Sequence, residues 1–121
     1  MATLSTSLTI TSSDASTDSL SIAVSDTLTI GNPVITSGRV SVATGSETVL
    51  LAAADQATDT YFFIKNIDGT NYIEVKTDGA VVFSRLRAGE FLFANIKEST
   101  GIEIQADTAA CVVEYGYWTN A

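Results

Sequence analysis

Apolar residues recur at every second position in short runs along the chain. Leu8 and Ile10 alternate with threonines in "SLTIT", and Ile73 and Val75 alternate with charged residues in "YIEVK". Successive side chains of a β-strand point to opposite faces of its sheet, so this period is typical of strands that bury one face. The segment "TVLLAAADQA" has good helix propensity but is short and bounded by acidic turns. The spacing therefore predicts an all-β chain.

Seven such runs fill the second part of the chain, with turn residues between them. "DGTN", "TDG" and "RAGE" supply glycines, which adopt the positive φ of tight turns readily. Short strands at this spacing are typical of a sandwich or barrel, and we expect an antiparallel β-sandwich that is jelly-roll-like. The expected strands span residues 47–54, 60–67, 72–76, 80–86, 91–96, 102–106 and 110–118.

The first 48 residues differ in composition from the rest. They contain 21 Ser or Thr and no aromatic residue, whereas all ten aromatic residues lie between positions 61 and 118. Aliphatic and hydroxyl residues alternate in "SLTIT", "SLSIAV", "TLTIG" and "RVSVA", with "SSDAST", "SD", "GNP" and "TSG" as breaks. The apolar face of such aliphatic strands must be covered by the aromatic part or by a neighbouring chain. We expect residues 1–48 to be an extended arm that gains order by strand addition, or the first strands of the sandwich, and residues 49–121 to be the sandwich domain.

The strand "TYFFIKNI" is apolar on both faces. Phe62 and Ile64 share one phase, and Tyr61 and Phe63 share the other. A strand of this kind is either central and covered, or lies at a subunit interface. Because one face of a small sandwich should meet water, Tyr61 and Phe63 are candidate interface residues.

Charge excludes several classes of partner. Fourteen acidic residues against six basic ones give a net charge of −8, which repels nucleic acid and anionic lipid. No run approaches the roughly 20 apolar residues of a membrane span, and the N-terminus lacks the basic start and apolar stretch of a signal peptide. We therefore expect no nucleic-acid partner, no membrane partner and a cytoplasmic site of synthesis.

Histidine is absent from the chain, which removes His-based acid–base catalysis, the Ser-His-Asp and Cys-His arrangements, and His-containing metal sites. Glu90, Glu98 and Glu103 fall in turns or on outer strand phases, and Glu114 differs only in its more apolar strand. Solvated or salt-bridged carboxylates are expected at all four. Cys111 is expected to be a small buried residue. We expect neither an enzyme nor a cofactor.

The hairpin turn near Asn66, Asp68 and Asn71 is the best candidate for a metal site. Calcium prefers several oxygen ligands that include carboxylates, and this turn supplies one. Counting from Asn66, the twelfth position of a calcium-binding loop is Thr77 rather than Glu. The sequence therefore predicts turn chemistry and no metal.

Two further groups are candidates for an interface. Arg85 and Arg87 lie close to Glu90 in "SRLRAGE" and form either a surface ion pair or interface anchors. Trp118 lies on the opposite phase from Tyr115 and Tyr117, which we expect in the core. Trp118 is then a rim contact to a partner or a lone surface aromatic.

Residues 60–118 resemble small structural proteins of tailed bacteriophages, especially marine and cyanobacterial ones. The resemblance is carried by "YFFIKNIDGTNYIEV", "RLRAGEFLFANI" and "GIEIQADTAACVVEYGYW". It covers the "IKN" strand from Ile64 to Asn66, the turn and aromatic strand from Leu86 to Phe93, and the late strand pair from Ile102 to Tyr115.

This resemblance implies a virion component with a jelly-roll-like sandwich. The expected function is that of a capsid decoration (cement) protein that binds and stabilises the phage head. Its partners would be the major capsid protein and further copies of itself in a homotrimer, and it would lie on the capsid surface after synthesis in the host cytoplasm. The alternative is a fibre or tail module that recognises a receptor or a carbohydrate.

Overall fold

The computed structural model describes residues 2–31 and 36–121. This part of the chain contains ten β-strands and one short 3-10 helix, so the expected all-β class is confirmed. The elements are β1 (Ala2–Ser12), β2 (Leu20–Ile30), β3 (Thr36–Val42), β4 (Thr48–Leu51), η1 (Ala53–Asp55), β5 (Thr60–Asn66), β6 (Ile73–Thr77), β7 (Val81–Leu86), β8 (Phe91–Ile96), β9 (Ile102–Ala106) and β10 (Cys111–Thr119).

β1 and β2 form a separate two-stranded hairpin in which all 11 residues of each strand are paired. Leu8 lies opposite Val24 and Ile10 lies opposite Ile22, so the aliphatic residues of both strands share one face. The bends that connect the strands span residues 13–18 and so overlap the expected break "SSDAST". The expected break at "SD" is wrong, because β2 continues through both residues and stays paired with β1.

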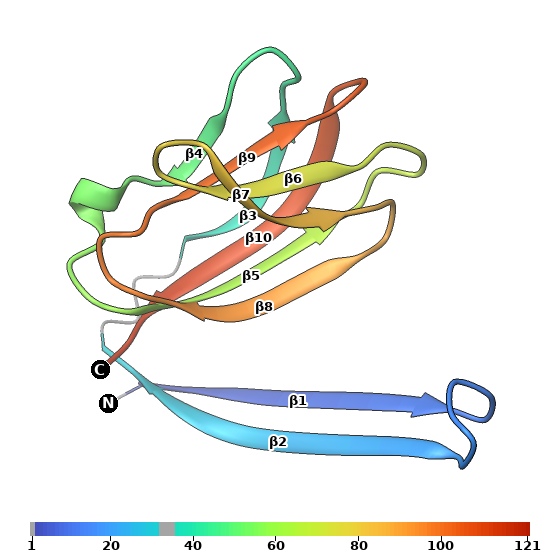
Figure 1. The fold of residues 1–121 in the computed structure, drawn as a ribbon. Coiled ribbons are helices and arrows are strands. Elements are labelled where there is room, and N and C mark those ends of the chain that lie inside the picture. Colours follow the sequence, from blue (N-terminus) through green and yellow to red (C-terminus); the bar gives the residue numbers. More distant parts are fainter. Residues whose placement is uncertain (1, 32–35) are drawn as a thin grey trace.

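The hairpin is joined to the rest of the molecule at its base. Ile30 forms a β-bridge with Asn120, and the N–H of Gly31 donates to the carbonyl of Thr119 at 2.9 Å. Ile30 is buried there. From this point the hairpin extends along the outer side of the sandwich, separated from it (Figure 1).

β3 to β10 form an antiparallel sandwich of two four-stranded sheets, in the orders β3-β10-β5-β8 and β4-β9-β6-β7 (Figure 1). The pairing is nested: β3 pairs with β10, β4 with β9, β5 with β8 and β6 with β7. The chain is therefore a long antiparallel ribbon folded over on itself. Pairing of β10 with β5 and of β6 with β9 completes the two sheets.

All seven strands expected in the second part have a counterpart in β4 to β10. The first of them is shorter than expected, because β4 ends at Leu51 and the 3-10 helix follows. Each of the two expected alternatives holds for a different piece of the N-terminal part. β3 is a strand of the sandwich, because it pairs with β10, whereas β1 and β2 pair with each other outside the sandwich. The "TSG" segment, expected as a break, belongs to β3. Within the described residues the hairpin thus ends at Ile30, and β3, which lies in the first 48 residues, pairs within the sandwich.

The core lies between the two sheets and follows the alternation of the sequence. Alternate apolar residues of β5, β6, β9 and β10 are fully buried there: Phe62, Ile64, Ile73, Val75, Ile102, Ile104, Cys111 and Val113. Tyr115 and Tyr117 pack against this cluster, as expected. Burial of large apolar side chains supplies most of the free energy that holds two such sheets together.

Candidate functional site

The outer face of the β3-β10-β5-β8 sheet carries aromatic side chains. Phe62 and Ile64 point into the core, so the alternate residues of β5 point outward, as the sequence predicts. The strand register places β8 and β10 residues beside them on the same face. The aromatic residues of this outer face are Tyr61, Phe63, Phe91, Phe93 and Trp118.

Contacts among these rings hold part of the surface in place. Tyr61 and Phe93 are stacked, with ring centroids 6.4 Å apart and planes at 6°. Trp118 lies over Gly116, where an added Cβ would stand 2.9 Å from the indole ring. Phe91 and Phe93 nevertheless remain 56% and 40% exposed. β8 is an edge strand, so these two phenylalanines lie at the open margin of the sheet.

The aliphatic face of the hairpin is the second uncovered apolar surface. Its residues are more buried at the base than further out: Ile30 is buried, Leu4 and Leu28 are half-buried, and Leu8 and Val24 are 41% and 56% exposed. Strands whose apolar face carries only aliphatic residues need a second surface packed on that face. The sandwich of the same chain covers this face at the base of the hairpin alone. An isolated two-stranded hairpin is marginally stable at best in water.

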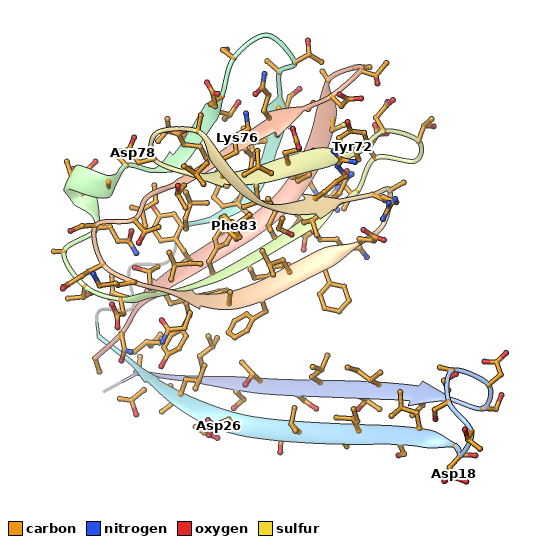
Figure 2. All side chains as sticks on the ribbon, viewed as in Figure 1. Asp18, Asp26, Tyr72, Lys76, Asp78 and Phe83 are labelled. Atoms are coloured by element: carbon orange, nitrogen blue, oxygen red, sulfur yellow. The ribbon has the colours of Figure 1, made fainter. Side chains whose placement is uncertain are left out.

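A cleft of about 820 Å³ separates the two apolar surfaces. Its apolar lining comes from Leu8 and Val24 on the hairpin and from Phe63, Phe91, Leu92 and Phe93 on the sheet. Figure 2 shows this space between the hairpin and β8, with side chains reaching into it from both sides. The hairpin side of the cleft also carries Ser, Thr and Asp residues, so the aromatic sheet surface faces a mixed aliphatic and polar surface across open space, which is suited to binding an amphipathic protein segment.

Charge differs between the two sides of the cleft. The outward residues of the sheet include Arg39, Lys65 and Glu114, which sum to +1 in a chain of net charge −8. Arg39 and Glu114 form an exposed ion pair at 3.4 Å, so Glu114 is salt-bridged, as expected. The hairpin residues 2–30 contain three aspartates and no Lys or Arg. An acidic hairpin thus faces a weakly basic sheet.

No protein-family model and no curated protein sequence matches this chain. Within residues 2–31 and 36–121, no helix is long and apolar enough to cross a membrane. The same residues contain no group of three or more His, Cys, Asp or Glu side chains arranged to hold a metal ion.

Arg85 lies on the other sheet, away from the aromatic face. Its guanidinium group stands 4.4 Å from the centre of the Tyr72 ring and 3.6 Å from the Glu74 carboxylate. The Asp107 carboxylate beside Tyr72 raises the pKa of the phenol, while Thr108 and then Tyr72 lower the pKa of the Asp107 carboxyl. Arg85 therefore pairs with Glu74 instead of Glu90, because both project from the same face of the paired strands β6 and β7.

Arg87 lies in the turn between β7 and β8. Its backbone N–H, rather than its guanidinium group, donates to the Glu90 carboxylate at 2.8 Å. Glu90 thus closes the "RAGE" turn, in which Gly89 has a φ of 82°. This turn sets the start of β8 and hence the position of Phe91 on the aromatic face.

The Asn66, Asp68 and Asn71 group forms a hydrogen-bonded turn. The Asp68 carboxylate accepts from the backbone N–H groups of Asn71 and Thr70, which lower its pKa. Asn66 is buried and donates to the carbonyls of Asn71 and Leu86. The polar groups of the turn are therefore occupied within the chain.

Of two other polar side chains, Lys76 differs from expectation and Cys111 does not. Lys76, expected to point into solvent, is buried, because its ammonium group is held by Glu47 at 3.3 Å and by Gln105. Cys111 is buried as expected, and burial raises the pKa of its thiol. Such a thiol is poorly reactive.

Phe91 and Phe93 were not among the interface residues expected from the sequence. Their alternation in "FLFANI" predicts that they share a face, and the structure places both outward beside Phe63 and Tyr61. The missing information was the position of β8 at the edge of its sheet, which depends on pairing between distant segments. Tyr61, Phe63 and Trp118 lie together, whereas Arg85 lies on the opposite sheet.

Proposed function

We propose that the chain is a non-enzymatic structural protein that works by self-assembly and attachment to a larger protein shell. The observation that carries this proposal is the cleft between two uncovered apolar surfaces of one small chain. Large exposed apolar surfaces are typical of protein interfaces, since a soluble monomer gains nothing from them. The aromatic face would hold copies together, most simply as a homotrimer.

The shell that we propose is the head of a tailed bacteriophage. This step rests on the resemblance of residues 60–118 to phage structural proteins. The eight strands of the sandwich and their nested pairing favour the jelly-roll arrangement that the resemblance implies. The chain would then be a capsid decoration protein on the virion surface, with the major capsid protein as its partner.

The hairpin would supply the means of attachment. Both of its strands have a free backbone edge, because β1 and β2 pair with no third strand in the described residues. A neighbouring chain can add a strand to such an edge through main-chain hydrogen bonds. Many weak contacts of this kind, repeated over a symmetric shell, would stabilise it by avidity and mass action.

The proposal is tested by locating the protein in purified phage particles. Mass spectrometry of virions made by the phage that carries this gene should find the chain at a fixed ratio to the major capsid protein. Immunogold labelling should place it on the head. A protein that is absent from purified virions, or that is confined to the tail, would refute the assignment to the capsid surface.

A further inference from the structure

The hairpin is longer than the sheet that faces it. Each of its strands has 11 residues, or about 36 Å at about 3.3 Å per residue, whereas β5 has seven and β8 has six. The cleft lining extends along the hairpin no further than Leu8 and Val24. Ile10 and Ile22 thus lie beyond the cleft, with 43% and 41% of their surfaces exposed. Figure 1 shows the hairpin tip extending past the end of β5.

The chain's own sandwich is therefore too short to cover the aliphatic face of its hairpin. The same chain leaves a second apolar surface open, the aromatic face around Phe63, Phe91 and Phe93. The two surfaces are present in equal numbers in any collection of copies. A contact between the hairpin of one copy and the sheet of another would cover both.

Charge favours this pairing. The hairpin carries Asp14, Asp18 and Asp26 without a basic residue, and Asp26 lies on the aliphatic face and lines the cleft. The outward face of the sheet has a net charge of +1, and its Lys65 makes no ion pair with any residue that the structure describes. Opposite charges at the margin of an apolar contact fix its orientation and disfavour wrong partners.

We propose that the aliphatic face of the β1–β2 hairpin of one copy packs on the aromatic outer face of a second copy. The occupant of the cleft is then a further copy of this chain. Because the contact joins two different surfaces, it closes when each copy both donates a hairpin and receives one, as in a reciprocal pair or a ring. The inference rests on the self-assembly part of the proposed function and is independent of the phage shell.

Cross-linking between differently tagged copies tests this contact. One tagged chain carries Ile22→Cys on the exposed aliphatic part of the hairpin, and a second carries Asn95→Cys, an exposed residue beside Phe93 on the outer face of β8. The two are co-expressed, purified through both tags in sequence and treated with a short thiol-specific cross-linker. The matched control replaces Ile22→Cys by Ser21→Cys, the neighbouring residue on the hydroxyl face. Buried Cys111 contributes little background, which wild-type chains measure.

The proposal predicts recovery of an oligomer that contains both tags and a covalent product from Ile22→Cys with Asn95→Cys, with loss of that product in the Ser21→Cys control. Equal products from both hairpin positions, or an oligomer without any product, would overturn it. A monomeric protein would overturn it as well, if the hairpin and sheet cysteines were placed together on one chain and became cross-linked within that chain. All three variants change exposed side chains, and an unchanged Tm checks their folding. No phage particle is present, so failure here leaves the proposed attachment to the shell untouched.

Discussion

The stacked rings of Tyr61 and Phe93 join the edge strand β8 to its neighbour β5 on the outside of the sandwich. This contact is made where water would otherwise meet the sheet, and it leaves Phe93 partly exposed. The outer face is therefore organised by aromatic packing and is still available to a partner. Its residues contribute less to the stability of the single chain than the core residues on the opposite face.

Substitution on the two faces of these strands should separate assembly from stability. Phe93→Ala should lower the free energy of unfolding by only about 1 kcal/mol, the typical value of an aromatic pair. Phe62→Ala should cost about 3–5 kcal/mol, because Phe62 is fully buried and its removal leaves a cavity. Urea denaturation measures both values. We expect Phe93→Ala to reduce the oligomer mass in light scattering, and an unchanged mass would count against the aromatic face as an interface.

Truncation before β3 should leave a folded sandwich. A fragment of residues 36–121 keeps β3 paired with β10 and keeps Val42 in the core, so we expect cooperative thermal unfolding with a Tm near that of the full chain. A fragment of residues 49–121 loses both and should unfold at a clearly lower temperature. Circular dichroism melting compares them. If the longer fragment failed to fold, the hairpin would be an integral part of the sandwich.

The phase of most strands was predictable from sequence, because it depends on local alternation. Ile73 and Val75 are buried as predicted, since a two-residue period fixes which side chains share a face. Strand neighbours were not predictable, because they depend on contacts between segments far apart in sequence. For that reason the edge position of β8, and with it the exposure of Phe91, emerged only from the structure.

The hairpin shows the same limit. The aliphatic faces around Ile10 and Ile22 were predicted, together with the need to cover them, but the uninterrupted length of β2 was not. Ser25 and Asp26 favour turns locally, yet pairing with β1 satisfies their backbone groups and carries the strand through. The burial of Lys76 was not predicted for a comparable reason. It depends on Glu47, which directly precedes β4 and is far from Lys76 in sequence.

Calcium should leave the stability of the protein unchanged. Asp68 already accepts hydrogen bonds from two backbone N–H groups, and the turn supplies no second carboxylate. Differential scanning fluorimetry with excess calcium and with a chelator should therefore give the same Tm. Asp68→Ala should lower the Tm equally in both conditions. A calcium-dependent rise in Tm that disappears in Asp68→Ala would contradict the assignment of this group as a turn.

Low pH should reduce the contribution of Glu47 to the free energy of unfolding. Its own backbone N–H and then Lys76 lower the pKa of the Glu47 carboxyl below its ordinary value of 4.5. A carboxyl whose pKa is lower in the folded state stabilises the fold fully above its ordinary pKa and loses that effect as the pH falls through the folded value. Urea denaturation of wild type and Glu47→Gln should show a stability difference above pH 4.5 that shrinks at lower pH. A difference that grows on acidification would exclude this account of Lys76 burial.

Binding to phage heads tests the central proposal most directly. Heads assembled from the major capsid protein of the proposed source phage, and lacking this chain, are incubated with the purified protein and sedimented. We predict saturable co-sedimentation at a fixed number of copies per head, a higher temperature of head disruption, and weaker binding by the fragment of residues 36–121. Folded protein that stays in the supernatant at every concentration, and leaves the disruption temperature unchanged, would contradict a decoration function.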